Sequence, residues 1–270
     1  MKTRIRLALG LAQILLAGRA WASFQNTPFS IKAEGLGGAF VGIADDPTAV
    51  FINPAGLVNL RYPEVALMYG KPFAGLEGID LSEGYTALAF PIGERVAFGA
   101  GGIMYRSPGV LSEYQWAAGF SALVVPQLAV GGSVNYLYHN YEIGKDPAYA
   151  GQGVFANGTS KGAVGFNAGM MALLTPQFQV GMAVSNLNQP NVGLVEEDPV
   201  PREIRYGALY RFQYVNLIGE LEQRDDGLES GLSLTNTFKL GVEVPWKMVS
   251  LRVGANNNAM TAGFGLRLGS

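Results

Sequence analysis

Few residues of this chain have the types and spacing that carry chemistry. The adjacent acids Asp45 and Asp46 could bind a cation, but neighbouring acids ahead of an apolar stretch usually cap a helix. His139 is the only histidine and has no evident serine partner. Residues 35–37 are glycine-rich but lack the preceding strand and the Gly-Lys-Ser/Thr of a phosphate loop. Since the chain also has no cysteine, we predict no enzyme, no metal site and no cofactor.

A second set of residues could bind a ligand rather than transform it. Acidic and basic residues recur in the C-terminal half, inside stretches that are otherwise apolar. An arginine can hold a carboxylate through two parallel hydrogen bonds. We therefore expect these charges to line an enclosed space and to include the groups that contact a ligand. The set is Arg205, Arg211, Glu220, Glu222, Lys239, Glu243, Arg252 and Arg267.

The elements that carry these charges are indicated by apolar and polar residues alternating with a period of two. In the stretch that begins at Arg202, Ile204 and Tyr206 point one way, while Arg205 and Arg211 point the other. The alternation recurs from residue 62 onward. Because Arg or Lys facing lipid at mid-depth costs about 2–4 kcal/mol, the charged set should face inward. Opposite charges should then pair between neighbouring strands.

The connections favour a membrane barrel over a soluble β-sandwich, which also alternates. Tight turns follow Ile92, Val125 and Thr175, whereas residues 144–159 and 188–200 form long loops. Short turns at one end and long loops at the other are typical of a membrane barrel with its turns in the periplasm. We predict an all-β fold, a transmembrane antiparallel β-barrel of about 12 strands. The expected strands are 63–72, 82–92, 94–106, 112–125, 127–143, 160–175, 177–188, 201–213, 215–224, 232–244, 247–256 and 259–268.

The composition agrees with a wall that faces lipid. Hydrophobic residues make up 49% of the chain and charged residues only 15%, against about 25% charged in soluble domains. The formal net charge of -2 provides no basic surface for nucleic acid. We expect membrane lipid to be a partner and nucleic acid not to be one.

The N-terminus has the pattern of an export signal. Three basic residues precede the apolar residues 7–18, and Ala20-Trp21-Ala22 forms a small-x-small cleavage pattern before Ser23. Beyond this leader, no apolar run reaches the roughly 18 residues of a membrane helix. We divide the chain into a signal peptide (1–22), an N-terminal plug (23–60) and the barrel (61–270).

Residues 23–60 hold many large apolar side chains, which need a surface to cover. The glycines at 35, 37 and 38 allow close contact with a wall, and Asp45 or Asp46 could cap a short helix whose first turn accepts Pro47. Asn53-Pro54 should end that helix. We expect a helical plug that seals the lumen, gates it, or does both. The small inward residues that leave room for it are Ala97, Gly99, Gly101, Ala117, Gly119, Gly131, Gly165 and Gly169.

The plug segment also resembles a known family. A glycine-rich start with Gly37 and Gly38, the pair Asp45-Asp46, a short apolar stretch and then Asn53-Pro54-Ala55-Gly56-Leu57 resemble the N-terminal plug of the FadL-like outer-membrane transporter superfamily. Together with residues 197–212, an acidic loop leading into a strand, they are more similar to its PorV/PorQ branch.

This resemblance implies a bacterial outer-membrane location and two functions. The FadL side implies a channel for hydrophobic or amphipathic small molecules such as long-chain fatty acids. The PorV side implies a component or anchor for protein secretion, with secretion-system proteins as partners. A plain polar pore is a third alternative. The residues favour transport over secretion only weakly.

Closure of the barrel leaves two alternatives open. Members of the resembled family continue for another hairpin and finish on an aromatic residue, whereas this sequence ends in Leu268-Gly269-Ser270. Either 12 strands close by themselves, or the sequence lacks the last two of 14. Because an open edge in lipid leaves backbone groups unpaired, we expect residues 261–268 to pair with residues 65–69.

Overall fold

The computed structural model describes residues 24, 30–72, 74, 75, 80–225 and 234–266. The predicted signal peptide with its cleavage site, and Arg267, lie outside the described residues. Among the described residues, no helix is long and apolar enough to cross a membrane.

Twelve antiparallel strands form one sheet, and each is hydrogen-bonded to its neighbours in chain order. Their bounds differ from the expected ones by at most three residues, so the prediction of an all-β antiparallel fold is confirmed. The strands are β1 (Glu64–Gly70), β2 (Ser82–Ile92), β3 (Val96–Ser107), β4 (Leu111–Val125), β5 (Leu128–Tyr141), β6 (Ser160–Leu173), β7 (Phe178–Ser185), β8 (Arg202–Arg211), β9 (Asn216–Asp225), β10 (Leu234–Trp246), β11 (Val249–Asn256) and β12 (Met260–Leu266).

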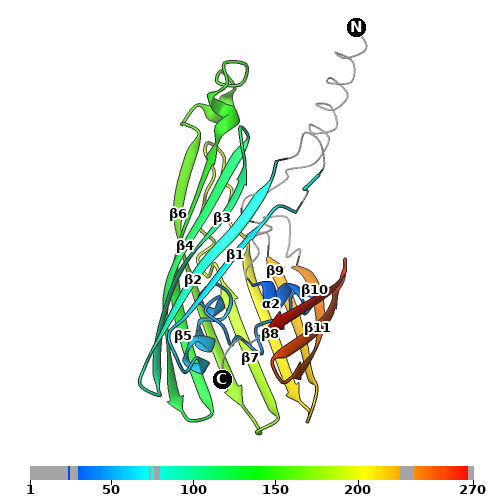
Figure 1. Cartoon of the computed structure of the whole chain (residues 1–270). Coiled ribbons are helices and arrows are strands. Elements are labelled where there is room, and N and C mark those ends of the chain that lie inside the picture. Colours follow the sequence, from blue (N-terminus) through cyan, green and yellow to red (C-terminus); the bar gives the residue numbers. More distant parts are fainter. Residues whose placement is uncertain (1–23, 25–29, 73, 76–79, 226–233, 267–270) are drawn as a thin grey trace.

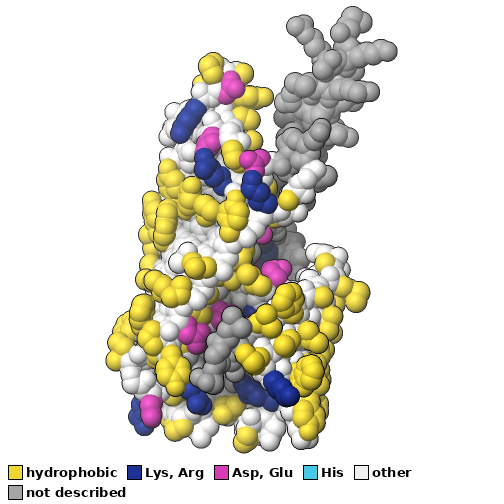
Figure 2. Space-filling model, viewed as in Figure 1, with side chains coloured by type: hydrophobic (Ala, Val, Ile, Leu, Met, Phe, Trp, Pro, Cys, Tyr) yellow, Lys and Arg dark blue, Asp and Glu magenta, His cyan; other side chains and the backbone are white. Residues whose placement is uncertain are grey.

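The two faces of the sheet differ as the alternation predicts. In β4, Trp116 and Phe120 are 47% and 51% exposed, whereas the residues that directly follow them, Ala117 and Ser121, are buried. Hydrophobic side chains cover much of the outer face in view in Figure 2. So many exposed apolar side chains on one face are typical of a barrel wall in contact with lipid. They include Val65, Leu67, Phe98, Val134, Phe166, Tyr206, Phe238, Leu251 and Phe264.

The concave face of the sheet encloses residues 30–60, which we call the inner segment (Figure 1). It contains the helices α2 (Ile31–Glu34) and α3 (Ala49–Ile52) and the 3-10 helix η1 (Pro54–Asn59). Leu36, Phe40, Phe51 and Leu57 are almost fully buried against the strands. The main hydrophobic core therefore lies between the inner segment and the wall.

Glycines allow the inner segment to touch the wall through backbone. A Cβ added to Gly101 would lie 2.6 Å from the Phe51 ring, and one on Gly207 would overlap the amide of Gly42. The expectation that small inward residues leave room for this segment is confirmed at Gly101 and at Gly131, which faces Ala55. Gly37 has a φ of +70° and lies against the Ala255 backbone, where an added Cβ would meet the backbone nitrogen at 2.6 Å.

The helix in this segment begins differently from the prediction. Its N-cap is Thr48, which makes no side-chain cap bond, and Pro47 precedes the helix. Asp46 instead accepts hydrogen bonds from the backbone N–H of Thr48, at 2.8 Å, and from the Thr48 hydroxyl. The expectation of an aspartate N-cap is therefore wrong, because the Asp46 side chain stabilises the turn that precedes the helix rather than the first turn of the helix. Asn53 ends α3 as expected, and its side chain accepts from the Ala55 N–H of η1.

The expected pairing between the sheet edges is also wrong for the described residues. The hydrogen-bonded order runs from β1 to β12 without a β12–β1 pair. The inner segment contacts both sides instead. The Ile31 N–H donates to the Tyr85 hydroxyl on β2, and the Gly37 N–H donates to the Thr261 hydroxyl on β12. Direct pairing of β1 with β12 is thus replaced by contacts through α2 and the residues after it. In Figure 1 these residues appear between the two edges of the sheet.

The contact between Gly207 and Gly42 provides a test of this packing. We expect Gly207→Val to lower the free energy of unfolding by about 1–3 kcal/mol, because the added carbons meet backbone that has no room to move. Urea unfolding in detergent micelles measures the change. Gly132→Val is the matched control, since a Cβ there meets nothing closer than 3.6 Å. Equal stability of the two variants would contradict the close backbone contact.

Candidate functional site

The charged residues expected to face inward lie on the concave face of β8–β11. Arg205, Glu220 and Glu243 are buried, and the others are partly buried. The strand registers explain their grouping, because Arg205 is opposite Glu222, Lys239 is opposite Glu220, and Glu243 is opposite Arg252. Opposite charges therefore meet between neighbouring strands. The described members of the expected set are Arg205, Arg211, Glu220, Glu222, Lys239, Glu243 and Arg252.

Five of the wall side chains form what we call the inner ion network. Arg205 contacts Glu203 at 2.6 Å and Glu222 at 2.9 Å. Lys239 contacts the same Glu222 at 2.6 Å and Glu220 at 3.1 Å. Two cations thus lie among three carboxylates in a water-poor interior, where each charge needs a partner. Arg205 is already neutralised by protein groups, which leaves it poorly suited to hold a ligand carboxylate.

The network also fixes the inner segment. One carboxylate oxygen of Glu220 accepts hydrogen bonds from the Phe40 and Val41 N–H groups, both at 2.8 Å. The Gln179 side chain donates to the Gly42 carbonyl at 2.8 Å. Inside the segment, the Asn53 amide donates to the Val41 carbonyl at 3.0 Å. Residues 40–42 are therefore satisfied by the wall, as buried backbone groups must be.

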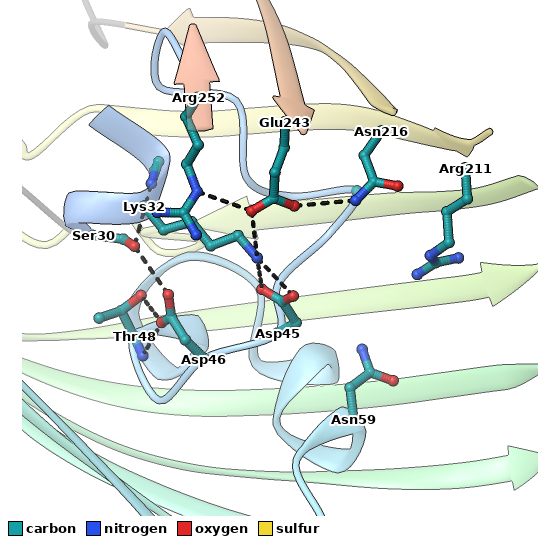
Figure 3. Close-up of polar contacts among 12 residues, drawn as sticks. Ser30, Lys32, Asp45, Asp46, Thr48, Asn59, Arg211, Asn216, Glu243 and Arg252 are labelled. Carbon is teal, nitrogen blue, oxygen red and sulfur yellow. Dashed lines mark hydrogen bonds and ion pairs between the residues drawn. The ribbon is translucent and has the colours of Figure 1, made fainter. Parts of the chain in front are cut away.

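A second polar cluster joins the inner segment to the wall (Figure 3). It lies nearer the end of the sheet that carries the short turns, the short-turn end, because Asn216 begins β9 there and is opposite Glu243. Lys32 contacts Asp45 at 2.8 Å and Glu243 at 3.9 Å. Glu243 also accepts from Arg252 at 2.9 Å and from Asn216 at 3.1 Å. Asp45, considered above as a cap or a cation ligand, therefore serves as the partner of Lys32.

Arg211 differs from the other inward arginines. Its guanidinium donates to the Gln179 side chain at 3.0 Å, and no carboxylate contacts it among the described residues. Arg211 is the last residue of β8 and so lies at the short-turn end of the wall. Among the described arginines of the expected set, Arg205 and Arg252 pair with glutamates, whereas Arg211 pairs with no carboxylate and keeps guanidinium donors available.

The opposite end, with the long loops, contains a pocket of about 500 Å³. It lies between the loop that holds η2 (Glu142–Lys145) and η3 (Gly153–Phe155) and the loop of residues 188–200. We call it the outer pocket. Its lining is partly apolar and partly acidic. The lining residues are His139, Tyr141, Gly153, Val154, Phe155, Gly193, Leu194, Val195, Glu196, Glu197 and Asp198.

Aromatic rings lead from this pocket toward the interior. Phe155 lies 6.2 Å from Tyr141, Tyr141 lies 4.8 Å from His139, and His139 stacks on Phe24 at 6.2 Å. We call these four residues the ring row. None of the four was expected at a functional site from the sequence. The inward phase of β5, which places residues 137, 139 and 141 on one face, is the signal that could have found two of them.

The space beneath the ring row is small and polar. A cavity of about 20 Å³ there is lined by Phe24, Phe51, Gln115, Asn135 and Asn167 among others. Because one water needs roughly 10–15 Å³ of such volume, this cavity has room for a single water. The side-chain oxygen Oδ1 of Asn135 is buried without a hydrogen-bond partner among the described residues, so a water is suited to this place.

Several solved structures share this fold. The chain is similar to the toluene transporter TbuX of Ralstonia pickettii, with a TM-score of 0.59 and 16% identity over 91% of this chain and 90% of that chain. It is similar to the monoaromatic hydrocarbon channel CymD, with a TM-score of 0.60 and 15% identity over 87% and 83%. A FadL homologue of Pseudomonas aeruginosa has a TM-score of 0.58 and 14% identity over 90% and 82%.

These similarities show that the chain has a FadL-like β-barrel fold. The prediction of a transmembrane β-barrel fold is thereby confirmed. No protein-family model matches the sequence, and no curated protein matches it.

The contacts of Glu220 lead to a test of the inner ion network. We expect Glu220→Ala to lower the free energy of unfolding by about 3–5 kcal/mol, because it leaves the buried Phe40 and Val41 N–H groups without an acceptor and removes one of the two carboxylates that Lys239 contacts. Glu220→Gln keeps an acceptor for the N–H groups and should cost less. Urea unfolding in micelles measures both, with the exposed Glu94→Ala as control. A loss no larger than that of the control would contradict the anchoring role.

Asp46 leads to a test of pH dependence. Burial raises the pKa of Asp46 above 3.8, against the opposing hydrogen bonds from Thr48 and Ser30. Because the folded state binds this proton more tightly, the contribution of Asp46 to stability is present below pH 3.8 and is lost as the pH rises through the raised pKa. The stability of the wild type relative to Asp46→Asn should fall over that interval in urea titrations. A difference that does not change with pH would contradict the prediction.

Proposed function

We propose that this chain is a bacterial outer-membrane channel for hydrophobic or amphipathic small molecules, such as long-chain fatty acids. The observation that carries the proposal is the ring row, which connects a partly apolar outer pocket with the interior of a FadL-like barrel fold. Aromatic faces bind apolar ligands without requiring a fixed set of hydrogen bonds. The similar proteins TbuX, a toluene transporter, and CymD, a monoaromatic hydrocarbon channel, support a hydrophobic substrate for this chain as well.

In this proposal the inner segment acts as a plug. A ligand enters between the long loops, moves along the ring row and meets the segment that Glu220 and Gln179 fix to the wall. Passage requires that some of these contacts break. The available donors of Arg211 at the short-turn end then provide a place for a carboxylate headgroup before release into the periplasm.

The alternatives have less support among the described residues. A role as a component or anchor for protein secretion was implied by the PorV/PorQ resemblance, but no described feature favours it over transport. We also propose that the protein is not an enzyme. The His139 ring packs between Phe24 and Tyr141, which suits a pocket wall better than proton transfer to a substrate.

The first test is uptake by liposomes that contain the mature protein. We expect Phe155→Ser to slow the uptake of toluene and of a labelled long-chain fatty acid by about two- to tenfold, because the outermost ring of the row is lost. Tyr149→Ser is the matched control, since Tyr149 lies in the same loop outside the pocket lining. Uptake by the wild type at the level of empty liposomes would eliminate the transport proposal.

The second test separates the headgroup from the tail. We expect Arg211→Gln to slow fatty-acid uptake by about tenfold, as the loss of a charge-assisted hydrogen bond predicts, and to leave toluene uptake unchanged. Arg205→Gln should instead lower stability, because Arg205 bridges Glu203 and Glu222. If Arg211→Gln changes the uptake of both compounds equally, Arg211 does not contact a headgroup.

A further inference from the structure

The outer face of the sheet contains a groove of about 800 Å³ across β6–β10. Its side chains form two transverse rows, because neighbouring strands are in register. One row is mostly small and consists of Ala172, Val180, Ala208, Gly219 and Leu240. The other row is large and consists of Met170, Met182, Tyr206, Leu221 and Phe238. The small row forms the floor of what we call the wall groove, and large side chains border it.

The inner segment packs on the concave side of the wall directly behind the wall groove. On the concave side, Gly181 and Gly207 bear directly on the backbone of Val41 and Gly42. Gly42 in turn has no room for a Cβ, which would lie 2.7 Å from the Ala208 nitrogen. Ala208 and Gly219 are the smallest residues on the opposite, outward side of the same strands. The place where the inner segment contacts the wall through backbone is therefore also the place where the lipid-facing side of the wall has only small side chains.

The position of the wall groove determines the chemistry of its occupant. It is continuous with the exposed apolar outer face, whose surroundings in a membrane are acyl chains rather than water. Its floor at Ala208 is two residues from Tyr210, which packs on Phe178 next to the short turns. Aromatic residues at such a place mark the membrane interface. The wall groove thus lies just on the hydrocarbon side of one interface.

We propose that the wall groove binds one acyl chain of a membrane phospholipid, taken from the leaflet that the short turns face. Its volume falls within the range of about 300–1,000 Å³ that is usual for small-molecule sites. A chain in the groove contacts the floor and the row of large side chains beside it, whereas a chain on the smooth wall contacts one surface. It therefore exchanges more slowly than the surrounding lipid. The inference goes beyond transport and holds whether or not the barrel conducts a substrate.

The test is retention of lipid by the mature protein after reconstitution in vesicles of phosphatidylethanolamine and phosphatidylglycerol. Protein released into a mild detergent is analysed by native mass spectrometry. We expect one retained phospholipid per wild-type chain. Gly219→Leu places a side chain in the groove, and its Cβ meets only Leu240, at 3.8 Å, so the fold is not strained. We expect this variant to lower the ratio of bound to free protein by about tenfold, which corresponds to the loss of roughly two methylene contacts.

Ala100→Leu is the matched control, because Ala100 is an exposed outward residue of β3, away from the groove. It should retain lipid like the wild type. Heat-dependent migration in gels verifies that all three proteins are folded. Three outcomes would overturn the proposal: wild type without retained phospholipid, equal retention by Gly219→Leu and wild type, or a wild-type dimer that Gly219→Leu dissociates. The last outcome would assign the groove to a second copy of the chain.

Discussion

The structure depends on direct backbone contact between the inner segment and the barrel wall. Gly42 and Gly207 approach so closely that neither position has room for a Cβ. Glu220 satisfies the adjacent Phe40 and Val41 N–H groups. Without this contact, the apolar side chains of residues 36–57 would have no surface to cover, and the small inward residues of the wall would border a void. The core of this protein is therefore formed by two parts that cannot pack alone.

Charge inside the barrel follows from the same arrangement. A wall that faces lipid must direct its charges inward, and an interior filled by protein then requires each charge to have a partner. The glutamates of β8–β10 meet this requirement for Arg205, Lys239 and Arg252. Arg211, at the end of β8, is outside this pairing. The proposed contact between Arg211 and a ligand headgroup depends on this lack of a carboxylate partner, which follows from the position of Arg211 at the end of β8.

The sequence predicted the positions of the strands better than the contacts between residues that are distant in the chain. Alternation located every strand to within three residues, because side-chain direction in a strand depends only on the neighbouring positions. Inward glycines such as Gly101 indicated where another segment would approach. The partners of each arginine could not be assigned, since they depend on registers between strands. The ring row joins Phe24 to Phe155, and five strands lie between these two residues in the sequence. The expected edge pairing is replaced by hydrogen bonds from α2 and the residues after it to β2 and β12.

The inner segment is near the start of the chain, and residues 49–59 pack on β3–β6, but the partners of residues 37–41 are near the end. The hydrogen bonds from Phe40 to Glu220 and from Gly37 to Thr261 span 180 and 224 residues. Contacts of such separation form late, because a long loop must close before they stabilise anything. The apolar residues 36–41 therefore stay uncovered on one side until the last strands have assembled. In the cell this interval is the period of greatest aggregation risk for the chain, because an apolar surface is exposed while its partner strands are still being assembled.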